Sequence, residues 1–359
     1  MASRISRLQK QFDKLAIDAF LVTNQKNIFY LTGFDLMEGD GCLLVTKDRA
    51  IIITDARYQL ALEEFDSDEV VATISQDYYG DLNKICLVSK ITVLGYEDTI
   101  SYRLFDLLDE LMEAAIVPFT NLIEKMRMIK DSTEIAKLER AAKLHDEGYQ
   151  FAFNEVHAGM TERELANRLD FWMKQHGASG ESFPTIVASG ENSAKPHATA
   201  SDKVIEDGDI VTLDFGYYVD GYTADMTRTF AVGEVDDRLK EIYEIVETAM
   251  NRVIDKIKVG QTGDVMDHAG RDYIAERGYG ENFNHGMGHG IGLDVHELPA
   301  RYGSDSADLK FVNNEVITVE PGIYIEGLGG VRIEQDVIVT HNGPRVLTGK
   351  PSQSLPVTR

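Results

Sequence analysis

Apolar residues in the first third of the chain occur in short runs that alternate with segments of helical spacing. The runs are rich in β-branched residues and are typical of buried strands, whereas Ile5, Leu8, Phe12 and Leu15 recur along one helix face. This alternation is typical of an α/β domain. The pattern predicts strands at 19–23, 42–46, 50–54, 70–74 and 91–96, and further helices at about 58–65, near Leu82 and at about 104–112.

Two pairs of capping residues mark the start of a second region. In each pair an N-cap residue is followed three positions later by an acid, which predicts the first turn of an amphipathic helix: Asp131 with Glu134, and Thr161 with Glu164. Strands then dominate, interrupted by helical patterns at about 236–257 and 263–277. We therefore predict two domains, residues 1–125 and residues 126–359.

The composition excludes several classes of protein. The 359 residues carry a formal net charge of −24, so we expect no nucleic-acid partner, because phosphate binding requires clustered cations. Charges are scattered through the N-terminal segment, and no uncharged apolar run approaches the roughly 18 residues of a membrane-spanning helix. We expect no membrane association and a cytoplasmic location. Cys42 and Cys86 lie in apolar runs and are expected to be core residues, not a disulfide or a nucleophile.

Two predicted strands of the second domain carry an acid in their middle. Asp214 lies in the apolar run VTLDFG, and Asp225 follows at a similar depth after a predicted hairpin turn at Asp220-Gly221. A buried carboxylate without a partner costs several kcal/mol, so each acid requires a cation, a set of hydrogen bonds or a proton. For Asp225 alone, an ion pair with Arg228 would suffice.

Three later segments add further acids and imidazoles. NHGMGHGIGLDVHE contains His285, His289 and His296 among four glycines, a composition that is unsuited to a helix and suits backbone that approaches a site closely. Glu320 ends the apolar strand of ITVEPGIY, and Glu334 is expected within the strand of GGVRIEQDVIV. Four neighbouring buried anions are untenable without positive charge, and two divalent cations would carry four charges. Oxygen-rich sites with one imidazole suit Mn, Co, Fe or Zn.

These segments together resemble the metal site of the pita-bread metallopeptidases, a family that includes methionine aminopeptidase, aminopeptidase P, prolidase and the metal-free creatinase. The resemblance covers most of the chain, because the aminopeptidase P and prolidase branch also has an N-terminal creatinase-like α/β domain. It implies that an α+β pita-bread catalytic domain follows that domain. The motifs LDFG, ADMTRTF, GHGIG, VEPGIY and VRIE carry it, with Asp214, Asp225, His289, Glu320 and Glu334 in the family's order.

The resemblance implies a role for each candidate site residue. Asp214 would bind one metal ion, His289 and Glu320 the other, and Asp225 and Glu334 would bridge both, with Mn as the expected metal and Co, Zn or Fe as alternatives. A metal-bridging hydroxide would be the nucleophile, and Glu320 would also shuttle the proton. By position, His197 would lie against the scissile bond, His296 would stabilise the tetrahedral intermediate, His285 would line the proline pocket, and Tyr324 and Arg332 would orient ligands and seat substrate.

The chain departs from the family pattern after the last glutamate. Family members usually have two aspartates there, whereas this chain has Gln335 and Asp336. Successive side chains of a strand point to opposite faces, so Gln335 is expected to face away from Glu334 and to affect metal binding little.

The long N-terminal domain implies an enzyme acting at Xaa-Pro bonds, since methionine aminopeptidases lack it. An aminopeptidase P removes the first residue of a longer peptide, whereas a prolidase splits a dipeptide and needs a cation for its free carboxylate. Arg301 is a candidate for that cation, but the polar sequence that follows it, YGSDSAD, favours an ordinary surface arginine. The segments FYLTGFDLMEGDGCLLV and ITDARY resemble aminopeptidase P of Gram-positive bacteria, so that type is the first hypothesis and prolidase the second. The third hypothesis is a non-catalytic peptide-binding module with the same fold; such modules typically lose ligands, and this chain retains all five.

The resemblance also implies a homodimer that acts on proline-containing peptides. In relatives, the N-terminal domain packs against a partner subunit, and its neighbouring loops restrict the mouth of the active site. We therefore expect residues before about 125 to limit substrate length. Closed twofold assembly is also the commonest oligomeric state.

Overall fold

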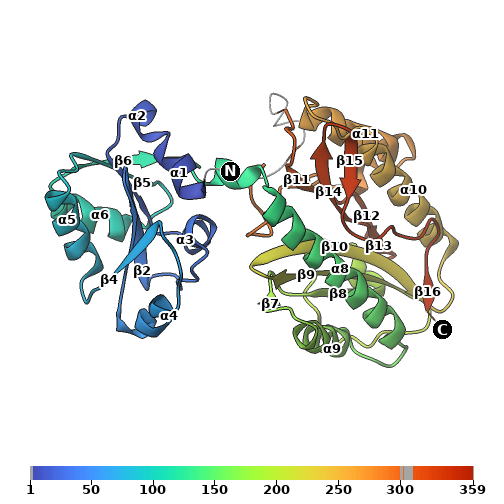
Figure 1. Ribbon diagram of the computed structural model, residues 1–359. Coiled ribbons are helices and arrows are strands. Elements are labelled where there is room, and N and C mark those ends of the chain that lie inside the picture. Colours follow the sequence, from blue (N-terminus) through green and yellow to red (C-terminus); the bar gives the residue numbers. More distant parts are fainter. Residues whose placement is uncertain (1–2, 300–301, 303–309, 359) are drawn as a thin grey trace. The chain divides into compact units, whose positions relative to one another are not determined.

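The computed structural model describes residues 3–299, 302 and 310–358. The chain divides into two compact units, Met1–Arg127 and Met128–Arg359 (Figure 1). The first unit contains one sheet and the second contains three, and each unit has its own core. Within the described ranges, none of the helices has the length and apolar character needed to span a membrane.

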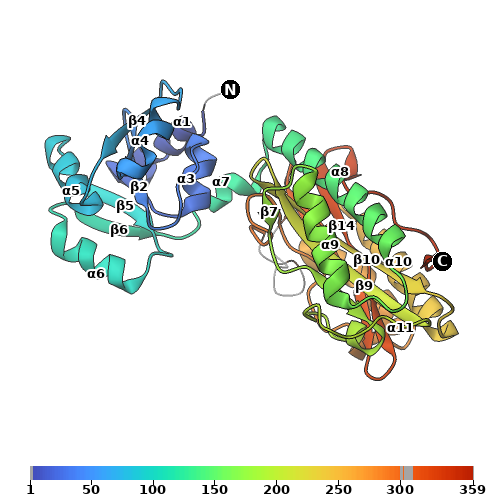
Figure 2. The same cartoon turned by 90° about the horizontal axis from the view of Figure 1, so that it is seen from below.

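The first unit contains one mixed six-stranded sheet. Its elements are α1 (Arg4–Gln9), α2 (Phe12–Leu15), β1 (Ala19–Val22), α3 (Gln25–Thr32), β2 (Gly41–Thr46), β3 (Ala50–Thr54), the 3₁₀ helix η1 (Ala56–Tyr58), α4 (Gln59–Glu63), β4 (Val70–Ile74), α5 (Tyr78–Val88), β5 (Val93–Glu97), α6 (Tyr102–Leu111), β6 (Ala115–Phe119) and α7 (Glu124–Met128). The strand order is β4-β3-β2-β1-β5-β6. Helices α5 and α6 cover one face, where Cys42 and Cys86 are buried as free thiols, and α1 and α3 cover the other (Figure 2). The predicted α/β class is confirmed.

The predicted helices and strands of the first unit are present, and three further elements are not foreseen by the sequence pattern. These are α3, β6 and α7. β6 is an edge strand of the sheet, and its apolar run contains Pro118, a residue that argues against a central strand and is tolerated at an edge.

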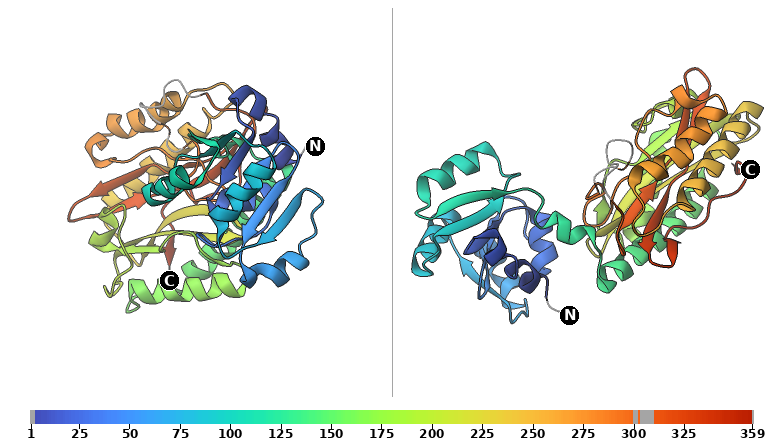
Figure 3. Two further views of the ribbon diagram at one scale, coloured as in Figure 1. Left: turned by 90° about the vertical axis from the view of Figure 1, so that its left-hand side faces the viewer. Right: turned by 90° about the horizontal axis from the view of Figure 1, so that it is seen from above.

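The second unit places strands between two pairs of helices. Its elements are α8 (Ser132–Glu155), α9 (Glu162–Gln175), β7 (Gly180–Glu181), β8 (Ile186–Ser189), η2 (Gly190–Ala194), β9 (Asp209–Val219), β10 (Tyr222–Val232), α10 (Asp237–Ile254), α11 (Gly263–Glu276), η3 (Gly280–Asn282), β11 (Val316–Val319), β12 (Gly322–Ile325), β13 (Gly329–Arg332), β14 (Gln335–Thr340), β15 (Gly343–Val346) and β16 (Val357–Thr358). Helices α8 and α9 pack on one side of β9 and β10, and α10 and α11 pack on the other side (Figure 3). Both predicted capping boxes are present, at the starts of α8 and α9.

The central hairpin of the second unit brings two acids to the same face of the sheet. β9 and β10 are joined by Asp220 and Gly221, which both have positive φ, at 52° and 81°. This is the backbone of a type I′ turn, and it confirms the predicted hairpin. Thr227 pairs with Asp214, so the two side chains share a face. Asp225 lies two residues from Thr227 and therefore points to that face too.

Helix α8 is attached to this hairpin through a buried histidine. The Nδ1 atom of His145 lies 2.7 Å from the carbonyl oxygen of Ala141, and its Nε2 atom accepts a hydrogen bond of 2.9 Å from the backbone N–H of Tyr217. The ring also stacks on Phe215. One nitrogen donates and the other accepts, so the network assigns the neutral tautomer. Burial lowers the pKa of His145 from 6.5 to about 4.

This histidine should make the fold sensitive to acid. In the unfolded chain this imidazole binds a proton below about pH 6.5, whereas in the folded chain it does so only below about pH 4. The free energy of unfolding therefore falls as the pH drops through that interval, by about 3 kcal/mol over the whole interval. We expect urea unfolding to show about 2 kcal/mol of this loss between about pH 7.5 and pH 5. The pH dependence should be smaller by that amount in His145→Gln. The exposed His157 provides a control: if His157→Gln flattens the profile equally, His145 is not the cause.

Candidate metal centre and active site

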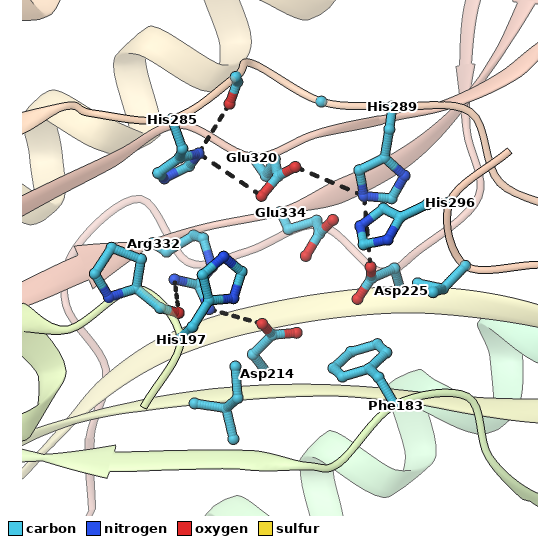
Figure 4. Close-up of a pocket in the computed structure, with 15 residues that line it drawn as sticks. Phe183, His197, Asp214, Asp225, His285, His289, His296, Glu320, Arg332 and Glu334 are labelled. Atoms are coloured by element: carbon cyan, nitrogen blue, oxygen red, sulfur yellow. Dashed lines mark hydrogen bonds and ion pairs between the residues drawn. The ribbon is translucent and has the colours of Figure 1, made fainter. Parts of the chain in front are cut away.

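A pocket of about 390 Å³ in the second unit collects nine of the ten site residues predicted from the sequence (Figure 4). The tenth, Tyr324, does not line the pocket but contacts two residues that do. Arg301 lies outside the described residues. The pocket is lined by Phe183, Ile186, Pro196, His197, Asp214, Asp225, His285, Gly286, Gly288, His289, Val295, His296, Glu320, Arg332 and Glu334.

The four carboxylates reach the pocket from three parts of the strand framework. Asp214 and Asp225 come from the β9–β10 hairpin, and Glu320 follows β11 directly. Glu334 was expected inside a strand, and this prediction is wrong: it lies in the two-residue break between β13 and β14. The break forms because the backbone N–H of Glu334 donates to the carbonyl oxygen of Thr227, across to β10, at 3.1 Å. The side chain is nevertheless almost fully buried, as expected.

His289 faces the carboxylates with one free ring nitrogen. Its Nδ1 atom lies 3.1 Å from the carbonyl oxygen of Gly290 and is assigned the proton. Its Nε2 atom lies 3.8 Å from Asp225 Oδ2 and 3.6 Å from Glu320 Oε1. One ligand atom each from Asp225, His289 and Glu334 lie within 4.8 Å of one another. Metal–ligand bonds of about 2.0–2.2 Å place neighbouring ligand atoms about 3–4 Å apart, so these spacings suit a shared cation better than direct hydrogen bonds.

Unpaired oxygens inside the site provide a second test of whether cations fit. Asp214 Oδ1, Asp225 Oδ1 and Glu334 Oε1 are all buried, and no residue in the described part of the chain gives them a hydrogen bond. Buried polar atoms in native proteins are nearly always paired. Three unpaired carboxylate oxygens directed into one pocket with an available imidazole nitrogen form the donor set of a divalent-metal site. The residues present therefore fit the predicted metals.

Without cations, the carboxylates disfavour one another's ionisation. Burial, followed by the charges of Glu334 and Asp214, raises the pKa of Asp225 well above its ordinary value. Burial and the charge of Asp214 raise the pKa of Glu334 to about 7, and burial and Glu334 raise that of Glu320. Burial lowers the pKa of His289 to about 3, so this imidazole is neutral and able to act as a ligand.

Arg332 organises the opposite side of the pocket. Its Nη2 atom donates to Asp214 Oδ2 at 2.7 Å, and its Nη1 atom donates to the Tyr324 hydroxyl at 2.9 Å. The same hydroxyl lies 2.8 Å from His285 Nε2. Burial lowers the pKa of His285 to about 4, so its ring is neutral at physiological pH. His197 and His296 are exposed at the pocket, and the His296 ring lies 4.2 Å from that of His289.

The ion pair between Arg228 and Asp225, considered from the sequence, is not formed. Arg228 is buried, and its guanidinium donates to the backbone carbonyl oxygens of Thr227, Glu334 and Gly349 instead. Successive positions of a strand alternate between faces, and Arg228 lies three positions after Asp225, so the two side chains point to opposite faces of β10. Arg228 therefore fixes the backbone at Glu334 and leaves Asp225 without a cation from this side chain.

Two buried residues support the acids and were not among the predicted site residues. Thr227 donates to Glu334 Oε2 at 2.7 Å and accepts from Arg332 Nε at 3.2 Å. Asp336 accepts a hydrogen bond from the backbone N–H of Asp225 at 3.1 Å. The two-residue alternation along β10 could have indicated Thr227, whereas no local signal places Asp336 beneath Asp225. Gln335 contacts Thr348 and Gly349 and does not line the pocket, in agreement with its predicted orientation.

The glycine-rich segment approaches its neighbours too closely for side chains. A Cβ atom on Gly288 would lie 2.1 Å from the carbonyl oxygen of Thr318, and one on Gly290 would lie 2.3 Å from that of Leu298. The segment is irregular, as predicted, and the backbone N–H of Thr318 donates to the carbonyl oxygen of His289 at 2.8 Å. Glycine therefore lets the segment lie directly against β11 and hold His289 beside Glu320.

Comparison with known families agrees with this architecture. Residues 136–341 match metallopeptidase family M24, and residues 4–129 match the creatinase/prolidase N-terminal domain. The chain therefore belongs to metallopeptidase family M24. The predicted family and fold class are confirmed, and the protein is a metallopeptidase with a creatinase-type N-terminal domain.

Individual relatives are similar along nearly their whole length. The chain is 37% identical to the Xaa-Pro dipeptidase of Pyrococcus horikoshii, covering 97% of both chains. Among solved structures, the Xaa-Pro dipeptidase from Bacillus anthracis has 43% identity and a TM-score of 0.92, with 99% of both chains covered. The X-Pro aminopeptidase from Thermotoga maritima has 37% identity and a TM-score of 0.90, with 97% of this chain and 100% of that chain covered.

Proposed function

We propose that this enzyme hydrolyses the peptide bond between an amino acid and a following proline. The observation that carries the proposal is the convergence of Asp214, Asp225, Glu320, Glu334 and His289 on one pocket, with buried carboxylate oxygens left unpaired. The names of the relatives support the choice of Xaa-Pro bonds. The apolar side chains of Phe183, Ile186 and Val295 in the same pocket suit a proline ring.

The acids and His289 are proposed to hold two divalent cations, with Mn as the expected metal. Asp214 would bind one ion, His289 and Glu320 the other, and Asp225 and Glu334 would contact both. When bound, such ions supply a water of lowered pKa and polarise a carbonyl group. The five side chains bring four negative charges and one neutral imidazole, which balances the charge of two divalent ions.

The remaining residues are proposed to position the substrate and move the proton. Glu320 would carry a proton on its carboxylate to the leaving amine. His296 and His197, both exposed at the pocket, would donate hydrogen bonds to the peptide. His285 would form part of the wall for the proline ring, held by the Tyr324 hydroxyl at 2.8 Å. Arg332 would keep Asp214 and Tyr324 in place.

Aminopeptidase P is the first candidate for the substrate-length class. Arg332 is the one arginine among the described residues that line the pocket, and its three nitrogens already donate to Asp214, Tyr324, Thr227 and the carbonyl oxygen of Pro196. A dipeptidase must hold the free carboxylate of its substrate, preferably with a cation. The relatives named Xaa-Pro dipeptidase favour prolidase as the second candidate.

One experiment tests the function and separates these candidates. The Mn-loaded enzyme is incubated with an Xaa-Pro dipeptide and with the Xaa-Pro-Yaa tripeptide that has the same first two residues. We expect hydrolysis of both to be abolished by a chelator and the tripeptide to be preferred. Preference for the dipeptide would identify a dipeptidase. A metal-free protein that cleaves neither peptide would favour the non-catalytic binding module.

We further propose that the enzyme is a homodimer. Light scattering is expected to give about twice the chain mass of 40.1 kDa at moderate salt, where repulsion between the acidic chains is screened. A chain that starts near residue 126 should lose dimerisation and discriminate less against long peptides. A full-length protein that stays monomeric would contradict the proposal.

A further inference from the structure

The loop that carries His197 to the pocket has little regular structure of its own. This rim segment, residues 190–200, follows β8 and contains only the short 3₁₀ helix η2. It contributes Pro196 and His197 to the pocket lining. A loop with so few internal hydrogen bonds requires outside contacts if it is to place a side chain accurately.

A single carboxylate holds both ends of the rim segment. Glu162, in the first turn of α9, is fully buried. Its Oε1 atom accepts hydrogen bonds from the backbone N–H and the hydroxyl of Ser189, at 2.8 and 2.9 Å, and from Asn192 Nδ2 at 3.1 Å. Its Oε2 atom accepts from the backbone N–H and the hydroxyl of Ser201, at 3.1 and 2.6 Å. Ser189 and Ser201 are the residues that flank the segment.

These hydrogen bonds keep Glu162 ionised inside the protein. Burial alone would raise the pKa of Glu162, but the donors on Ser201, Ser189 and Asn192 outweigh burial and lower it below the ordinary value. The carboxylate also lies at the N-terminal end of α9, where the helix dipole favours a negative charge. Hydrogen bonds to an ionised acceptor are about twice as strong as those between neutral groups, so Glu162 is a strong anchor.

The rim segment is in turn connected to the metal-binding side of the pocket. The carbonyl oxygen of Pro196 accepts a hydrogen bond from Arg332 Nη1 at 3.1 Å, and Ser193 Oγ accepts one from the backbone N–H of Gly330 at 2.8 Å. Arg332 also binds Asp214. A displacement of the segment would therefore move His197 relative to Asp214 and Arg332, although Glu162 itself does not line the pocket.

We propose that Glu162 is a positioning residue that sets His197 over the substrate pocket by holding both ends of the rim segment. The inference deepens the proposed Xaa-Pro peptidase function and depends on it for the effect on catalysis. Its physical part, the anchoring of the segment, does not depend on the reaction.

The variant Glu162→Gln tests this proposal because it keeps the shape of the side chain but replaces one acceptor oxygen with a donor. That donor must then face an N–H of Ser189 or Ser201. We expect kcat/KM for the Xaa-Pro peptide to fall about 10-fold to 100-fold, as for a misplaced active-site group, with the metal content unchanged. Hydrogen exchange of the Ser189 and Ser201 amides should accelerate about tenfold or more. Glu164→Gln, the same substitution two residues along α9, is the matched control and should change neither quantity.

A double substitution shows whether the effect acts through His197. In a His197→Ala background, Glu162→Gln should change kcat/KM by less than about twofold, because the group that it positions is already absent. An equal loss in both backgrounds would overturn the proposal and leave Glu162 as a general stabilising residue. Unchanged amide exchange in Glu162→Gln would also overturn it.

A milder variant keeps the proposal testable if the buried glutamine prevents folding. Ser201→Ala removes one donor, the hydroxyl that lies 2.6 Å from Glu162 Oε2, and should give smaller effects in the same direction in both measurements. No change in either measurement for Ser201→Ala would count against the anchor. If the wild-type enzyme cleaves neither peptide, the proposed function fails, whereas the exchange experiment still decides whether Glu162 holds the segment.

Discussion

Replacement of Asp225 by Asn or of Glu334 by Gln is expected to release at least one metal ion and to lower kcat/KM by about 10³-fold or more. Each variant keeps the shape of a side chain that would contact both cations and removes its charge. Metal ions contribute several kcal/mol of transition-state stabilisation, and each 1.36 kcal/mol is a factor of ten in rate. Elemental analysis and peptide hydrolysis measure the two effects. Glu247→Gln, at a buried acid outside the pocket, is the control and should retain both ions.

Asp225→Asn should raise the thermal stability of the protein when all metal is removed. Burial and neighbouring charges raise the pKa of Asp225, which means that its negative charge is unfavourable in the chelated protein. Asp225→Asn removes that charge, so the chelated variant is expected to unfold at a higher temperature than the chelated wild-type enzyme. Retention of two tightly bound ions together with an unchanged melting temperature would show that Asp225 is not a metal ligand.

Substitution of two neighbouring histidines should give opposite results. His296→Ala is expected to lower turnover by about 10²–10³-fold with little loss of metal, because its proposed role is to donate a hydrogen bond to the reacting group. His289→Ala should instead lower metal occupancy, since its Nε2 atom faces Asp225 and Glu320. The control is substitution of the exposed His268, on α11, which should change neither turnover nor metal content. Equal metal loss in the two variants would mean that their roles have been assigned wrongly.

Much of this architecture could be predicted because it depends on short-range patterns. The capping pairs at Asp131 and Thr161 each begin a helix, and the Asp-Gly turn at Asp220 joins two strands as expected. The predicted convergence of the acids depended on the resemblance to a known family as well as on their burial. A pattern of apolar residues alone does not show that Asp214 and Glu334, more than one hundred positions apart, lie in one pocket.

Long-range contacts account for what the sequence did not indicate. Glu334 leaves its strand because its backbone bonds to Thr227, and Arg228 binds three carbonyl oxygens instead of an acid. Neither arrangement has a local signature, because a backbone carbonyl is present at every position of the chain. The anchoring of Ser189 and Ser201 by Glu162 also has no local signature, because these donors lie 27 and 39 positions away along the chain. Glu162 lies inside the capping motif of Thr161 and Glu164. That motif predicts the start of the helix but does not predict the hydrogen bonds of Glu162 to distant residues.

The pairing of β9 with β10 also limits how the length of this chain can change. The register runs without interruption from Tyr222 opposite Val219 to Val232 opposite Asp209. Because side chains alternate between faces, a single residue inserted or deleted inside β9 after Asp214, or inside β10 before Asp225, would turn one of the two carboxylates away from the pocket. A residue added at the turn would only lengthen the loop and would leave the pairs in place. The number of residues from each acid to the turn, and not only the identity of the two acids, is therefore a condition for the site to exist.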